Sequence, residues 1–209
     1  NILAKRYSEK IVQLEKLRVD QLETQLKLLK MQYHPHFLFN ALNTIYFLID
    51  EENEEAIEAV ELLSDLLRYQ LYDINTKVTI EEEIDYLRTY IQFQRLRMTK
   101  RLQFEESFDP ELTGQKIHPL LFLPLLENAF KYIGGAYRIQ VSMRKEGAKV
   151  CLGVSNTFNP DFLEQRKGKG IGIDNLRKRL ELLYPDKHEL RIKKDNTRFR
   201  VELCIDLSE

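Results

Sequence analysis

The stretch "HPLLFLPLLENAFKYI" (residues 118–133) is apolar along most of its length and predicts a mostly buried helix. Its few polar side chains include Glu127, Asn128 and Lys131. Asn128 and Lys131 are three residues apart, so they share one face of a helix. An amide oxygen can bind Mg²⁺, and a lysine can meet a phosphate group. The same pair would also suit the solvent-facing side of an ordinary amphipathic helix.

Alternating apolar and polar residues predict strands on both sides of this helix. One strand is predicted at 101–108, and two more at 137–147 and 148–156, joined through the "EGA" turn. A further helix is predicted at 172–184, and a hairpin that turns at "DN" is predicted at 188–207. Strands and helices mixed in this order favour a two-layer α+β domain.

A glycine-rich segment, "GKGIGIDN" (168–175), precedes the second of these helices. It places Gly168, Gly170 and Gly172 at alternate positions. Glycines let the backbone approach phosphate groups, and a helix N-terminus offers free N–H groups to them. The signal is weak by itself, because a plain glycine-rich hinge would look the same.

The helix predicted at 79–98 has a clear start. Thr79 and Glu82 have the spacing of a capping box, in which each residue satisfies a backbone N–H group of the other. The preceding "NTK" (75–77) breaks the helical pattern, so we place a domain boundary there.

Helical patterns fill the chain before this boundary. Residues 1–33 contain neither glycine nor proline, and helices are also predicted at 36–49 and from the polar turn 50–53 to about residue 74. Two helices with a short connection form an antiparallel hairpin, and two hairpins form a four-helix bundle. A second copy of the chain is the simplest partner. The first helix carries an apolar seam at Val12, Val19, Leu22, Leu26, Leu29 and Tyr33.

Two histidines lie in the apolar stretch "MQYHPHFLFNAL" (31–42). On a helix, His36 falls on a narrow polar stripe, and Pro35 weakens the turn beside it. A neutral imidazole is a competent nucleophile toward phosphorus. A lone helical histidine is more often an ordinary surface residue. A metal site shared with His34 is disfavoured, because no carboxylate or cysteine cluster accompanies the pair.

The composition limits the classes of function. Lys and Arg total 32 and Asp and Glu total 33, so the basic excess of a duplex-binding domain is missing. Cys151 and Cys204 are far apart in sequence, and we expect two reduced, apolar side chains in strands. No apolar run approaches the roughly 20 residues of a membrane span. The chain opens at Asn1 inside a helical pattern, so we expect a fragment of a longer protein.

Taken together and in this order, these segments resemble the LytS/YesM-type sensor histidine kinases. "QYHPHFLFNALNTI" (32–45) resembles the phosphoacceptor motif, and "IEEEIDYLRTYIQFQRLRM" (80–98) resembles the start of the catalytic domain. "HPLLFLPLLENAFKY" (118–132) resembles the N box, and "GKGIGIDNLRKRLELLY" (168–184) resembles the glycine box. The resemblance runs from about Met31 to the C-terminus.

The resemblance implies an architecture and an activity. Residues 1–76 would form a coiled coil and a helical hairpin of a dimeric four-helix bundle, and 77–209 an α/β sandwich of the histidine-kinase, Hsp90 and gyrase ATPase type. The protein would phosphorylate His36 from Mg-ATP and pass the phosphoryl group to an aspartate of a response regulator. It would be a homodimer, bind no nucleic acid directly, and form the cytoplasmic portion of a bacterial inner-membrane protein.

The resemblance also assigns a nucleotide site. Asn128 would hold Mg²⁺ and Lys131 would contact phosphate. Tyr132 and Ile133 replace the family's His-Gly after that lysine, and the Tyr132 ring could still stack on adenine. Asn156 stands where the family has an aspartate that receives the adenine amino group, and its amide oxygen is an acceptor without a charge. The lid over the phosphates would consist of Gly168, Gly170 and Gly172, with Asn175 behind them.

Departures from the family pattern leave two rival functions open. His34 replaces the usual asparagine before Pro35, and Phe158 replaces a glycine after Asn156. One rival is a non-catalytic signalling scaffold with a degenerate nucleotide site. The other is a gyrase-type clamp that hydrolyses ATP without phosphorylating itself, which would have no use for the motif around His36.

Overall fold

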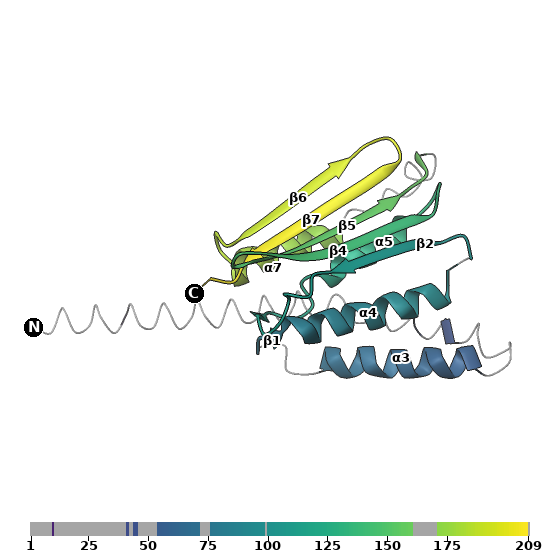
Figure 1. Cartoon of the computed structure of the whole chain (residues 1–209), viewed down its shortest axis with the longest axis horizontal. Helices are drawn as coiled ribbons and strands as arrows, with labels where there is room; N and C mark the ends of the chain where they lie inside the picture. Colours follow the sequence, from purple (N-terminus) through teal and green to yellow (C-terminus); the bar gives the residue numbers. More distant parts are fainter. Residues whose placement is uncertain are drawn as a thin grey trace, which may run out of the picture. The chain divides into compact units, whose positions relative to one another are not determined.

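A computed structural model of the chain describes residues 10, 41, 44–45, 54–71, 76–98, 100–160 and 171–208 (Figure 1). The chain divides into two compact units, residues 1–42 and 43–209, and every helix and strand below belongs to the second. The helices predicted at 1–33 and 36–49 lie largely outside the described residues, as do His36, Gly168 and Gly170. The domain boundary near residue 76 stays a prediction.

A five-stranded mixed sheet dominates the second unit, in the order β2-β4-β5-β7-β6 (Figure 1). Edge strand β2 (Gln103–Phe108) runs parallel to β4 (Arg138–Glu146). All other pairs are antiparallel: β4 with β5 (Lys149–Thr157), β5 with β7 (Arg198–Asp206), and β7 with β6 (His188–Lys194). The strands predicted from alternation are therefore confirmed, and both hairpins turn where "EGA" and "DN" predict.

The side chains of the sheet alternate between two faces, as strand geometry requires. One face supplies the core, and helix α5 (Leu123–Tyr132) packs against it on β5 and also contacts α7 (Ile171–Leu183). Burying apolar side chains between a sheet and its helices stabilises this layer arrangement, and the predicted α+β class is confirmed. On this face, the buried apolar residues of the three central strands are Ile139, Val141, Met143, Val150, Leu152, Val154, Val201, Leu203 and Ile205.

Helix α4 (Ile80–Leu96) begins at the predicted capping box. The Thr79 hydroxyl accepts a hydrogen bond from the backbone N–H of Glu82 at 3.3 Å, and the Thr79 N–H donates to the Glu82 carboxylate at 2.7 Å. The two backbone N–H groups, of Glu82 and Thr79, are donors that the start of a helix leaves without a partner inside the helix. The strand before it, β1 (Val78–Thr79), pairs with β3 (Lys116–Ile117) in a small sheet that the sequence patterns do not predict.

Helix α5 (Leu123–Tyr132) is shorter than the predicted helix over 118–133. Pro119 has no N–H group, and Leu120 adopts φ = +60°, a left-handed conformation that ends any helical run. The helix starts only at Leu123, with Pro124 in its first turn, where a missing N–H costs nothing.

Helix α3 (Glu54–Leu71) packs along α4. The rings of Tyr69 and Tyr86 are stacked with centroids 4.4 Å apart, and the Gln70 amide donates to the Tyr86 hydroxyl at 2.7 Å. On another side of α3, the apolar side chains of Ile57 and Val60 are 58% and 45% exposed.

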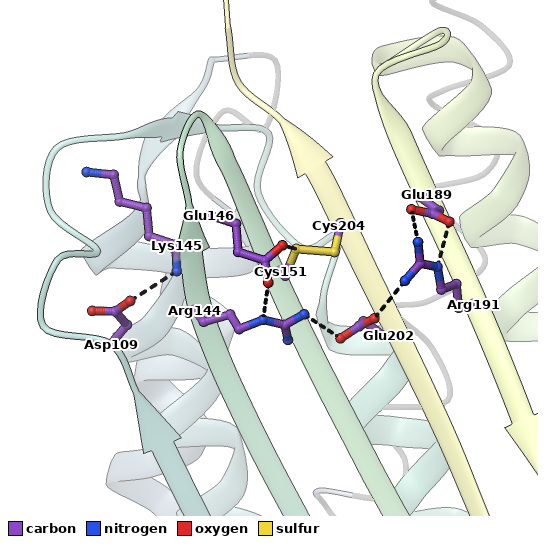
Figure 2. Close-up of a disulfide and its surroundings, with 9 residues drawn as sticks. All are labelled: Asp109, Arg144, Lys145, Glu146, Cys151, Glu189, Arg191, Glu202 and Cys204. Atoms are coloured by element: carbon purple, nitrogen blue, oxygen red, sulfur yellow. Dashed lines mark hydrogen bonds and ion pairs between the residues drawn. A yellow bond between two sulfur atoms is a disulfide. The ribbon is translucent and has the colours of Figure 1, made fainter.

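Cys151 and Cys204 form a disulfide, so the expectation of two free thiols is wrong (Figure 2). The two residues are 53 positions apart in sequence, but the antiparallel register of β5 and β7 places them directly opposite each other. Sequence spacing carries no information on that register, which is why the pairing escapes prediction.

A chain of charged side chains crosses the same open face of the sheet (Figure 2). Arg144 on β4 contacts Glu146 at 2.6 Å and Glu202 on β7 at 2.8 Å, and Arg191 on β6 contacts Glu189 at 2.6 Å and Glu202 at 3.8 Å. Such exposed pairs contribute little stability each, but they keep this face polar. Among the residues that the structure describes, no helix is both long and apolar enough to cross a membrane.

Candidate nucleotide-binding site

The C-terminal half of α5 carries the polar residues singled out in the sequence. Asn128 and Tyr132 are partly buried, whereas Lys131 is exposed. The Lys131 ammonium lies 5.3 Å from the centre of the Tyr132 ring, within the range of a cation–π contact. The helix thus presents an amide, a cation and an aromatic ring close together.

Glu127, also on α5, has a shifted pKa. Burial raises the pKa of its carboxyl to about 7, and the positive charge of Lys131 opposes that shift. The carboxyl therefore gains and loses its proton close to neutral pH, which makes its environment measurable by titration.

Asn156 ends the core-facing side of β5 with its side chain 1% exposed. Its Nδ2 group donates to the Thr157 carbonyl at 3.2 Å, but its Oδ1 atom is buried without a hydrogen-bond partner among the described residues. An unpaired buried acceptor is rare and costs stability. The amino group of an adenine ring would supply the missing donor, so this residue fits an adenine nucleotide.

The segment after α5 is tied to the end of β5, which brings Asn156 close to that helix in the fold. The Thr157 hydroxyl donates to the Gly134 carbonyl at 2.8 Å and accepts from the Arg138 N–H at 3.0 Å. The Gly134 N–H donates to the Thr157 carbonyl at 3.0 Å. A Cβ atom on Gly134 would lie only 3.0 Å from the Asn159 nitrogen, so glycine permits this close approach.

Phe158 occupies the position where the family pattern has glycine. Its side chain is buried, and the Lys194 ammonium lies 5.2 Å from its ring centre. Phe158 directly follows the end of β5, so replacing glycine by phenylalanine adds an apolar side chain two residues after Asn156.

Helix α7 supplies the last of the predicted residues. Asn175 is buried on this helix, and α7 packs against α5. Around Gly172, nothing in the described parts of the chain lies within 4 Å of an added Cβ, so packing there does not demand glycine. The fold therefore brings Asn128, Lys131 and Tyr132 onto one helix, Asn156 onto the strand beneath it, and Asn175 onto the adjacent helix.

A buried carboxyl that was not among the predicted residues lies at the turn before α5. Glu83 on α4 is fully buried, accepts a hydrogen bond from the Leu120 N–H at 3.0 Å, and lies near Arg179 of α7. The spacing carries a signal for this burial: Glu83 lies three residues after Ile80 and four before Leu87, so it falls on the apolar face of α4.

Known proteins match most of the length of this chain. Residues 24–102 match the family model described as "Histidine kinase". The chain is 35% identical over 182 residues to the sensor histidine kinase YesM of Bacillus subtilis, with 83% of this chain and 32% of the relative covered. It is 30% identical over 184 residues to the sensor histidine kinase BtsS of Escherichia coli, with 86% and 33% covered.

The chain belongs to the histidine kinase family. The resemblance to sensor histidine kinases of the LytS/YesM type is thereby confirmed. The chain spans about a third of the length of these curated relatives.

Solved structures match the fold of this histidine kinase chain. A bacterial phosphotransferase matches with a TM-score of 0.50 at 10% identity, covering 88% of this chain and 95% of that one. The histidine kinase AdeS of Acinetobacter baumannii matches with a TM-score of 0.48 at 14% identity, covering 90% and 98%.

Proposed function

We propose that this chain is the kinase portion of a two-component sensor. It binds ATP with Mg²⁺, transfers the γ-phosphoryl group to His36, and passes that group to an aspartate of a response regulator. Beyond family membership, one observation carries the proposal: the buried Asn156 has an unpaired acceptor next to the helix that holds Asn128 and Lys131.

The residues divide the work of holding the nucleotide. Asn156 accepts the adenine amino group and Tyr132 offers its ring for stacking. Lys131 neutralises phosphate charge. Asn128 offers an amide oxygen to Mg²⁺, which prefers oxygen ligands and usually shares them with substrate phosphates and water. The lid over the phosphates is formed by Gly168, Gly170 and Gly172, with Asn175 behind it.

The proposed reaction moves one phosphoryl group. A nitrogen of the neutral His36 imidazole forms a bond to the γ-phosphorus, the bond from phosphorus to the β,γ-bridging oxygen breaks, and ADP leaves. The proton of the attacking imidazole passes to solvent. Bound Mg²⁺ would neutralise charge on the phosphates. Positioning and charge neutralisation by the protein then provide most of the acceleration.

The exposed face of α3 supports a homodimer. Ile57 and Val60 form an apolar surface on a helix whose other side packs against α4. A second copy of the hairpin, within residues 1–76, would cover this surface in a four-helix bundle, with 77–209 as the ATP-binding domain. We also propose that the chain acts as the cytoplasmic portion of a bacterial inner-membrane sensor.

A labelling experiment tests the phosphoryl transfer. Purified protein incubated with Mg²⁺ and γ-labelled ATP should acquire acid-labile phosphate, and the His36→Ala variant should acquire none. Equal labelling of both proteins would refute the role of His36.

Sedimentation equilibrium tests the dimer, which the Ile57→Glu substitution should dissociate.

One observation favours a second candidate, the non-catalytic scaffold. Asn156 is a neutral acceptor, and Phe158 fills a position where the family has glycine. Calorimetry with a non-hydrolysable ATP analogue separates the two functions. A kinase gives Mg²⁺-dependent heat, whereas a scaffold gives none.

A further inference from the structure

The turn at residues 118–122, which leads into α5, is held by three side chains from outside it. The Glu83 carboxyl accepts the Leu120 N–H at 3.0 Å. The Arg179 guanidinium donates to the carbonyls of Pro119 at 2.7 Å and Leu120 at 3.2 Å. At the start of the turn, the His118 N–H donates to the Tyr184 hydroxyl at 2.9 Å. Helices α4 and α7 therefore fix this turn from two directions.

The backbone of the turn needs such support. Leu120 has φ = +60°, a left-handed conformation that costs a non-glycine residue roughly 1–2 kcal/mol. Its N–H and carbonyl groups are buried, and both would be left unpaired without Glu83 and Arg179. The direction in which α5 leaves the turn thus depends on these two side chains.

Glu83 also connects this turn to α3. The Tyr69 hydroxyl donates at 2.8 Å to Oε2 of Glu83, the same oxygen that accepts the Leu120 N–H. Burial raises the pKa of the Glu83 carboxyl, while the hydrogen bonds from Leu120 and Tyr69 and the charge of Arg179 oppose that rise. One carboxyl oxygen therefore joins α3, α4 and the turn before α5.

We propose that Glu83 is a positioning residue of the nucleotide site. It fixes the conformation of the 118–122 turn and thereby the orientation in which α5 presents Asn128 and Lys131. The hydrogen bond from Tyr69 links this conformation to the position of α3. This inference rests on the nucleotide-binding function proposed above. Because coupling between two sites is reciprocal, nucleotide bound at α5 stabilises the Tyr69–Glu83 contact, and a displaced α3 weakens nucleotide binding.

The first test compares two substitutions of Glu83. Glu83→Ala removes the acceptor, and we expect amide hydrogen exchange over 120–132 to rise without nucleotide and the Kd of a non-hydrolysable ATP analogue to rise at least tenfold. Glu83→Gln keeps an oxygen that can accept the Leu120 N–H, so most of the affinity and of the exchange protection should return. A purely structural role predicts that both properties follow global stability alone.

A matched control separates positioning from stability. Met143→Ala removes a buried side chain in β4 that takes no part in the hydrogen bonds of the turn. This variant should lose stability as Glu83→Ala does and keep the analogue Kd within twofold. Equal losses of affinity in Met143→Ala and Glu83→Ala, or unchanged exchange over 120–132 in Glu83→Ala, would overturn the inference.

The second test addresses the coupling to α3. Tyr69→Phe removes only the hydroxyl, so the analogue Kd should stay within threefold. In the unsubstituted protein, the analogue should slow amide exchange in α3, and Tyr69→Phe should abolish that effect. Persistent protection in the variant would refute the coupling. If the unsubstituted protein binds no nucleotide, the proposed function fails, whereas exchange over 120–132 still decides the role of Glu83.

Discussion

The hydroxyl of Thr157 donates a 2.8 Å hydrogen bond to the carbonyl of Gly134, although 23 residues separate them. This contact fastens the segment that follows α5 to the end of β5. It therefore helps to fix the spacing between Lys131 on the helix and Asn156 on the strand, which under the function proposed above is the spacing that a nucleotide would span.

Replacing Thr157 tests this fastening. Thr157→Val keeps the shape of the side chain but loses the donor to Gly134 and the acceptor for the Arg138 N–H. Leaving buried backbone groups unpaired should lower the free energy of unfolding by about 1–3 kcal/mol, measured by urea denaturation. Thr157→Ser keeps the hydroxyl and should stay close to the unsubstituted protein. A valine variant of full stability would show that the contact is dispensable.

Asn156 should determine the preference for adenine. Asn156→Ala removes the unpaired buried acceptor, so we expect the affinity for an ATP analogue to fall roughly tenfold, equivalent to about 1.4 kcal/mol. The affinity for the corresponding GTP analogue should change little, because guanine has a carbonyl oxygen at the position of the adenine amino group whose hydrogen bond Asn156 would accept. Calorimetry measures both.

The neighbouring Ser155 provides the control for this substitution. Its side chain lies on the opposite face of β5, with its hydroxyl 3.5 Å from the Gln140 amide oxygen. Ser155→Ala should leave adenine binding unchanged. Equal effects of the two substitutions would mean that Asn156 does not contact the base.

Glu127 should make stability depend on pH. In the folded protein its carboxyl keeps a proton up to about pH 7, whereas the ordinary value of 4.5 applies when the chain is unfolded. The unfolded chain therefore binds fewer protons between these values, and the free energy of unfolding falls as pH rises through the window. The Glu127→Gln variant has no carboxyl at this position and does not lose stability in this way. The difference in free energy of unfolding between the variant and the unsubstituted protein should therefore shift in favour of the variant by roughly 2–3 kcal/mol from pH 5 to pH 8.

Denaturant unfolding of both proteins across this pH range measures the Glu127 effect. A stability difference that stays flat from pH 5 to pH 8 would mean that the Glu127 carboxyl is ionised throughout.

Reduction of the disulfide should destabilise the sheet domain. The disulfide between Cys151 and Cys204 closes a loop across 53 residues and so restricts the conformations of the unfolded chain. Reduction removes this restriction and should lower the free energy of unfolding by about 4 kcal/mol. Thermal unfolding with and without a dithiol reductant measures the effect. The Cys151→Ala, Cys204→Ala double variant should not respond to the reductant. A similar response in both proteins would place the effect elsewhere.

Local sequence determined most of the described elements. The β4–β5 hairpin follows from alternating side chains and from Gly147, whose φ of +61° suits the turn. Thr79 and Glu82 determine the start of α4, because a capping box needs only neighbouring residues. Asn128, Lys131 and Tyr132 lie in one short motif, so their grouping on α5 follows from helical spacing.

Tertiary structure alone decided the contacts between segments distant in sequence. The spacing of Glu83 with Ile80 and Leu87 favours its burial, but only the fold shows that the Leu120 N–H and the Tyr69 hydroxyl donate to its carboxylate. Cys151 pairs with Cys204 because two strands adopt one register out of several. In each case the interaction energy depends on which groups come into contact in the fold. A local sequence pattern indicates which secondary structure and burial a residue favours, but it does not identify the distant residue that it will contact.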